Sequence, residues 1–61
     1  MATTLESIVD KATNHLYLIK REQNPFYVCT NKAGEEVYFL KQDVFNKYKL
    51  GMFDISMKFM N

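Results

Sequence analysis

The chain is too short to base its stability on a large hydrophobic core. It has 61 residues, and a chain of about this size buries only about 60% of the surface that its unfolded form exposes. Small domains therefore often add a disulfide, a metal ion or a second subunit. Cys29 and His15 are the only residues of their kinds, so an intramolecular disulfide is excluded and a metal site is nearly so. We expect a single domain over residues 1–61 without a cofactor, in which self-association remains open.

Cysteine usage and the N-terminal residues favour a cytoplasmic protein. Secreted scaffolds of this size usually carry several paired cysteines. Residues 1–6 have neither the basic start nor the apolar stretch of a secretory signal. The longest aliphatic and aromatic runs, 16–19 and 37–40, have four residues each, whereas a membrane-spanning helix needs about 20. We therefore expect no membrane partner.

The N-terminal segment has the pattern of an amphipathic helix. Thr3 and Glu6 have the spacing of a capping box, in which two side chains satisfy the free N–H groups at a helix start. Apolar residues then recur at intervals close to the helical period of 3.6. They are Leu5, Ile8, Val9, Ala12 and Leu16. This pattern predicts a helix over about residues 4–15.

Two hairpins are predicted next, with four-residue loops at 22–25 and 31–34. Gly34 suits the positive φ that such a loop requires. Counting outward from the second loop pairs Val28 with Val37 and Tyr27 with Tyr38. Counting from the first pairs Ile19 with Val28. Like residues then lie opposite like, as cross-strand packing favours.

This register divides the meander into two faces, because strand side chains alternate. The more apolar face is expected to meet the N-terminal helix, and its residues are Tyr17, Ile19, Phe26, Val28, Val37 and Phe39. The opposite face is mixed, and its residues are Leu18, Lys20, Tyr27, Cys29, Glu36, Tyr38 and Leu40.

The C-terminal third predicts a short helix and a last strand. Asp43 is expected to cap a helix over residues 44–50 that ends at Gly51. Residues 53–59 then alternate between apolar and polar side chains, which is typical of a strand with one wet face. The expected fold is α+β, with an N-terminal helix packed on a three-stranded antiparallel meander, then a short helix and a C-terminal strand. The element order is α-β-β-β-α-β.

The residue types that carry chemistry are sparse. Cys29 and His15 are a conceivable nucleophile and base, but no third residue is evident to orient the imidazole. Glu35 and Glu36 are adjacent on a strand and point to opposite faces, so they cannot share a proton. The two glycines stand too far apart for a phosphate-binding loop. We expect a protein that is not an enzyme.

The mixed face is the predicted partner-binding surface. Tyrosine combines a large apolar ring with a polar tip and is enriched at protein interfaces. The predicted contact residues are Leu18, Lys20, Tyr27, Tyr38 and Leu40. The alternative is that another strand or a dimer partner covers this face as core. The C-terminal strand offers an edge through which a homodimer could form.

Basic residues suggest a second class of function. Lys41, Lys47, Lys49 and Lys58 could contact phosphates of a nucleic acid. The net charge is only +1 and one arginine is present, although base readout and phosphate clamping favour arginine. Nucleic acid is therefore the less favoured partner.

The amino-acid composition gives the last sequence-based expectation, because some residue types have AT-rich codons and others GC-rich codons. Residues with AT-rich codons number 28, and those with GC-rich codons number 7. A small protein from an AT-rich gene is typical of phage and mobile-element accessory proteins. We expect a non-catalytic protein-binding module that modulates a larger host protein by occupying its surface. The alternatives are a small nucleic-acid-binding protein and a structural subunit of a larger assembly.

Overall fold

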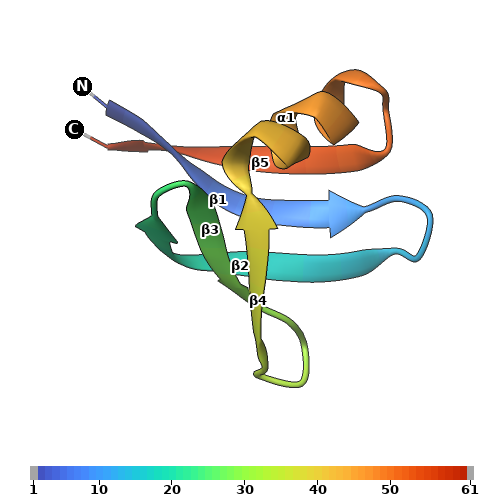
Figure 1. Cartoon of the computed structure of the whole chain (residues 1–61), viewed down its shortest axis with the longest axis horizontal. Coiled ribbons are helices and arrows are strands. Elements are labelled where there is room, and N and C mark those ends of the chain that lie inside the picture. Colours follow the sequence, from blue (N-terminus) through green and yellow to red (C-terminus); the bar gives the residue numbers. More distant parts are fainter. Residues whose placement is uncertain (1, 61) are drawn as a thin grey trace.

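The computed structural model is a small α+β domain in which a five-stranded antiparallel sheet is packed against one helix. It describes residues 2–60, and the side chains of residues 4–58. The elements are β1 (Ala2–Asp10), β2 (His15–Gln23), β3 (Phe26–Thr30), β4 (Glu36–Leu40), α1 (Lys41–Lys49) and β5 (Phe53–Met60). The strand order is β4-β3-β2-β1-β5, so β4 and β5 are the two edges (Figure 1).

The predicted N-terminal helix is wrong, because residues 2–10 form β1. This strand pairs antiparallel with β5 along its whole length and with β2 from Ser7 to Asp10. Thr3 and Glu6 therefore lie in a strand and cap no helix. The later elements are confirmed: β2, β3 and β4 form the expected meander, followed by a short helix and a C-terminal strand.

The middle strand of the meander is shifted by one residue from the predicted register. Val28 pairs with Tyr38 rather than Val37, and Ile19 pairs with Cys29 rather than Val28. The β3–β4 loop has five residues, 31–35, because the Asn31 side chain accepts hydrogen bonds from the backbone N–H groups of Ala33 and Glu35.

The first turn of the meander is also different. It has only two residues between the strands, 24–25, and a bulge at Lys20 restores the alternation in β2. The result is that only β3 is reversed. Its Tyr27 and Cys29 lie on the inner face, and its Phe26 and Val28 lie on the outer face, whereas the residues of β2 and β4 keep their predicted faces.

The core lies between the inner face of the sheet and α1. Its buried side chains are Leu5, Ile8, Tyr27, Cys29, Val44 and Phe53. The ring of Phe39 on β4 contacts that of Phe53 on β5 edge-to-face, with centroids 5.8 Å apart. Because these strands are the two edges of the sheet, the sheet is curved enough to bring one side chain from each edge into contact.

The helix ends as predicted and begins differently. Gly51 has φ 76°, and its N–H donates to Tyr48 O while Met52 N–H donates to Lys47 O. This pair of bonds is the Schellman arrangement, which favours glycine at this position. Asp43 is not the cap, because Leu40 is the N-cap residue and no side chain caps this end. Asp43 lies in the first turn and forms an ion pair with Lys47 at 3.2 Å.

The predicted alternation of the C-terminal strand is confirmed for the described side chains. Phe53 is buried and Ile55 is half-buried, both against the core, whereas Asp54 and Ser56 are exposed. Phe59 was expected to continue the apolar side of the strand, but its side chain lies outside the described part of the chain.

Candidate interaction surface

The outer face of β2, β3 and β4 carries an exposed apolar surface. Leu18, Tyr38 and Leu40 are 51%, 49% and 43% exposed. All three lie on this face: Tyr38 and Leu40 are opposite Val28 and Phe26 of β3, and Leu18 is opposite Thr30, at the other end of that strand. We call this surface, made of Leu18, Phe26, Val28, Tyr38 and Leu40, the outer patch.

Val28 is the centre of the outer patch. It is completely buried, although it faces away from the main core. Its cross-strand partners are Arg21 on β2 and Tyr38 on β4. The rings of Phe26 and Tyr38 meet edge-to-face with centroids 6.0 Å apart. Phe26 lies two residues before Val28 on the same face of β3, and Tyr38 lies opposite Val28 on β4. The two rings therefore limit the access of solvent to Val28 and give the patch a fixed shape.

Charged side chains flank the outer patch and largely neutralise one another. Lys20 Nζ lies 2.8 Å from Glu36 Oε2, and Arg21 Nη1 lies 3.6 Å from the same oxygen. The hydrogen bond from Lys20, together with its charge, lowers the pKa of the Glu36 carboxyl below its usual value. The bulge at Lys20 allows two consecutive basic residues to reach one carboxylate. The patch therefore has a polar border without a strong charge.

Four of the five predicted contact residues lie on this face: Leu18, Lys20, Tyr38 and Leu40. Tyr27 does not, because the shift of β3 turns it into the core, where it is only 6% exposed. Its ring packs edge-to-face on Phe45, and Lys41 Nζ lies 5.2 Å from the ring centroid. Burial and then the charge of Glu22 raise the pKa of the Tyr27 hydroxyl. Tyr27 is therefore a core residue.

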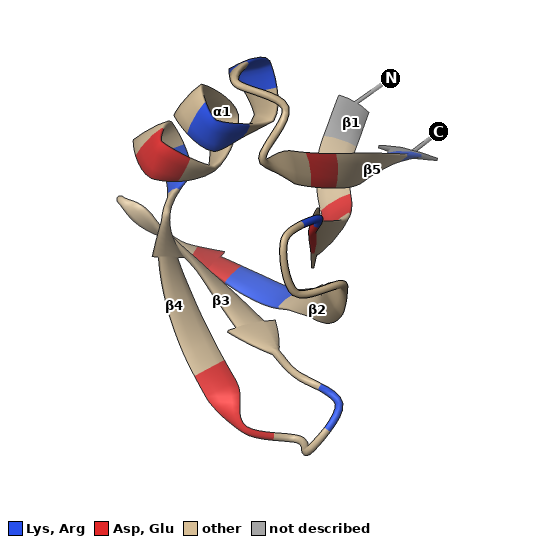
Figure 2. Ribbon diagram, turned by 90° about the vertical axis from the view of Figure 1, so that its right-hand side faces the viewer, with Lys and Arg blue, Asp and Glu red and all other residues tan. Residues whose placement is uncertain are grey.

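The four lysines proposed as nucleic-acid contacts do not form one surface. Lys41 Nζ lies 2.6 Å from Glu22 Oε1 and also donates to Asn24 Oδ1. Lys47 is paired with Asp43 and lies over the Phe53 ring. Lys49 is exposed in the last turn of α1, and Lys58 lines an opening between β1 and β2. Figure 2 shows acidic and basic positions interleaved along α1 and β2.

The conceivable nucleophile pair is not assembled. Cys29 is completely buried, and burial raises the pKa of its thiol to about 11. His15 is exposed at the start of β2, four residues before Ile19, which is the cross-strand partner of Cys29. Four strand residues span about 13 Å. Because the thiolate is the reactive form, this cysteine is poorly suited to nucleophilic attack. Among the described residues, no group of three or more metal-ligating side chains could hold an ion.

Sequence reasoning missed Phe26, Val28 and Arg21 as members of this face. Phe26 and Val28 were predicted on the inner face, and Arg21 was assigned to neither face. The reason is that the predicted β3–β4 loop has four residues, one fewer than the observed loop. The available signal was Asn31, a residue whose side chain often closes a turn on the backbone two residues later. An Asn-started loop of five residues would have placed Phe26 and Val28 outside.

Comparison with protein-family models, curated proteins and solved structures finds no match to this chain. Within residues 2–60, no helix has both the length and the apolar character needed to cross a bilayer.

Proposed function

We propose that this chain is a non-catalytic protein-binding module that uses the outer patch to occupy the surface of a larger protein. The observation that carries the proposal is the solvent exposure of Tyr38 and Leu40 beside the buried Val28, with the exposed Leu18 farther along the same face. The expected biological setting is that of a phage or mobile-element accessory protein acting on a host protein. That setting is supported by the excess of residues whose codons are AT-rich.

The physical argument is one of uncovered apolar area. Patches of a few hundred Å² on a monomer commonly mark a contact site. Tyrosine is a frequent anchor at such sites, because its ring supplies contact area at low conformational cost. Tyr38 occupies the middle of β4 and is already held by the Phe26 ring. A partner would therefore meet a preorganised aromatic side chain, which reduces the entropy lost on binding.

The charge pattern favours a protein over a polyanion. Lys20 and Arg21, the basic residues next to the patch, are directed to Glu36. A nucleic-acid surface would instead present basic groups to phosphates, and its affinity would fall steeply with salt. Neutral apolar recognition has only a weak dependence on ionic strength.

Affinity capture with matched variants tests the proposal. The purified chain and its Tyr38→Ala/Leu40→Ala variant serve as baits in a host lysate, and captured proteins are identified by mass spectrometry. We expect one protein to be retained by the native chain and by the control Lys47→Ala/Lys49→Ala, and to be lost with the patch variant. Titration of the purified partner should show at least about tenfold weaker binding, equivalent to ~1.4 kcal/mol.

Two results would contradict the proposal. The first is a partner that binds the native chain and the patch variant equally, because the contact surface then lies elsewhere. The second is capture of nucleic acid whose binding is lost with the lysine variant and falls steeply with salt. Folding of each variant is checked by NMR, so that loss of binding is not confused with unfolding.

A further inference from the structure

β1 and β2 separate partway along their length and leave two facing strand edges. β1 pairs with β2 only from Ser7 to Asp10, although its pairing with β5 continues to Ala2. β2 continues past Leu18 in pairing with β3 alone. Each strand carries a bulge where they part, at Glu6 in β1 and at Lys20 in β2. Within residues 2–60, no strand occupies the space between these edges.

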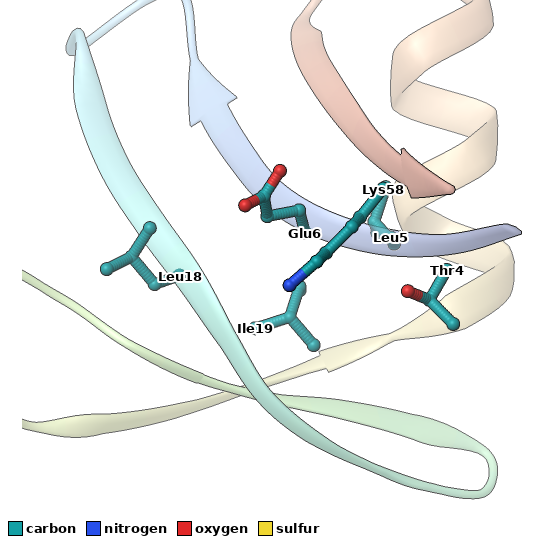
Figure 3. Close-up of a pocket in the computed structure, with 6 residues that line it drawn as sticks. All are labelled: Thr4, Leu5, Glu6, Leu18, Ile19 and Lys58. Carbon is teal, nitrogen blue, oxygen red and sulfur yellow. The ribbon is translucent and has the colours of Figure 1, made fainter. Parts of the chain in front are cut away.

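The opening between the two strands is lined by both. It is an open depression of about 410 Å³. Its lining residues are Thr4, Leu5, Glu6, Leu18, Ile19 and Lys58 (Figure 3). Leu5 is buried and Ile19 is half-buried, so they supply an apolar floor. Glu6 and Lys58 supply charged groups at its border, and Figure 3 shows the Lys58 side chain extending across the opening toward Ile19.

The main chain along this opening favours one kind of ligand. Backbone amide and carbonyl groups of successive strand residues point to opposite edges. Residues 4–6 pair with β5 on one side only, so at least one of their amide groups is directed to the opening. Such free main-chain groups match the backbone of an extended peptide, which can add to a sheet edge as a further strand. A small molecule in a depression of this size would contact the floor but would pair with few of these groups.

We propose that this opening is a second binding site, which takes an extended segment of a partner protein as an added strand along residues 4–6 of β1. One apolar side chain of that segment seats on Leu5, Leu18 and Ile19. The backbone of the bound segment lies beside residues 4–6 of β1, where β2 no longer pairs with β1. The site is independent of the proposed function, because only Leu18 belongs to both this opening and the outer patch.

The test uses a displayed library of short random linear peptides, panned against the full chain. The most enriched peptide is synthesised, together with an analogue N-methylated at alternate amides, which cannot donate main-chain hydrogen bonds. Amide exchange and chemical shifts measured by NMR report where each peptide binds. Two variants are compared with the native chain: Thr4→Trp, whose indole fills the opening, and the control Tyr38→Ala, which alters only the outer patch.

We expect the enriched peptide to slow amide exchange within residues 4–6. The Thr4→Trp variant should weaken binding at least about tenfold, and Tyr38→Ala should leave the affinity within about twofold. The N-methylated analogue should bind far more weakly. If Thr4→Trp does not fold, Lys58→Trp takes its place.

Four results would overturn the proposal: no enriched peptide, equal binding of the N-methylated analogue, binding that survives the tryptophan variant, or binding lost with Tyr38→Ala. The last result would place peptide recognition on the outer patch and would support the proposed function. A captured partner that binds the native chain and the Tyr38→Ala/Leu40→Ala variant equally, with peptide binding intact, would contradict the proposed function alone.

Discussion

Leu5 and Ile8 both point into the core although they are three residues apart on the same strand. In a regular strand, residues at this spacing face opposite sides. The bulge between Leu5 and Ser7 inserts Glu6 into β1 without an equivalent in β5. Leu5 therefore pairs with Met57 and Ile8 with Ile55, two residues apart on a strand that alternates without interruption. The extra residue Glu6 thus lengthens the spacing between two inward-facing residues of β1 from two positions to three.

Deleting Glu6 should leave Leu5 in the core. Leu5 and Ile8 would then stand two residues apart in a regular strand, still opposite Met57 and Ile55. The deletion should therefore lower the free energy of unfolding much less than Leu5→Ala, because loss of a buried leucine costs roughly 2–5 kcal/mol. The exposed-residue control Glu6→Ala should stay within roughly 0.5 kcal/mol. Urea denaturation measures all three variants. A deletion as costly as Leu5→Ala would show that Glu6 is not an insertion into an otherwise regular pairing.

The same bulge explains why the N-terminal strand could not be recognised from periodicity. Leu5, Ile8 and Val9 fit one stripe of a helix, and a bulged strand produces the same local spacing. The distinguishing signal was weaker. Thr3, Thr4, Ile8 and Val9 are β-branched, which favours strands. Pairing with β5, nearly fifty residues later, decides between the two structures, and such non-local pairing is not visible in a local window.

The rest of the fold was predicted where local signals were sufficient. Gly51 ends α1, and Phe53 and Ile55 alternate inward with Asp54 and Ser56 exposed between them. The faces of β2 and β4 were also correct. The face of β3 was not, because its register depends on the conformations of two turns. A one-residue difference at a turn moves every side chain of a strand to the opposite face. The candidate site therefore lost Tyr27 and gained Phe26 and Val28.

Tyr27 and Tyr38 should respond oppositely to the same substitution. Tyr27 is buried among Phe45, Cys29 and other core residues, so Tyr27→Ala should cost roughly 3–5 kcal/mol, as other aromatic truncations in cores do. Tyr38 is about half exposed and chiefly loses its edge contact with Phe26, so Tyr38→Ala should cost less than about 1.5 kcal/mol. Thermal and urea unfolding measure both. A larger loss for Tyr38 would mean that the outer patch is covered core.

The edge position of β5 predicts self-association. The strand is the last in the sheet order, and its Met57 is 42% exposed. An uncovered edge strand offers its backbone to a second chain. We expect sedimentation at high micromolar concentration to show a homodimer above the 7.2 kDa monomer. Ser56→Lys should weaken the dimer by placing a second positive charge near Lys58 on this edge. A monomer at all concentrations would contradict the predicted homodimer. The matched control for Ser56→Lys is Ser7→Lys on the adjacent strand β1.

Cys29 should make the protein less stable at alkaline pH. Burial raises the pKa of its thiol from the ordinary value of 9.0 to about 11 in the folded chain. Between these two values the unfolded chain loses the thiol proton and the folded chain keeps it, so unfolding becomes progressively easier as pH rises. The loss reaches about 2 kcal/mol near pH 11.

The test compares the pH dependence of urea unfolding for the native chain and for Cys29→Ala, because the two chains differ only in this thiol. The native chain should lose more stability between pH 9 and 11 than the variant. In addition, a thiol reagent at neutral pH should modify Cys29 only as fast as the chain opens, because the side chain is completely buried. Rapid modification of the folded protein, together with parallel pH profiles for the two chains, would show that the thiol is accessible and that β3 does not face inward at Cys29.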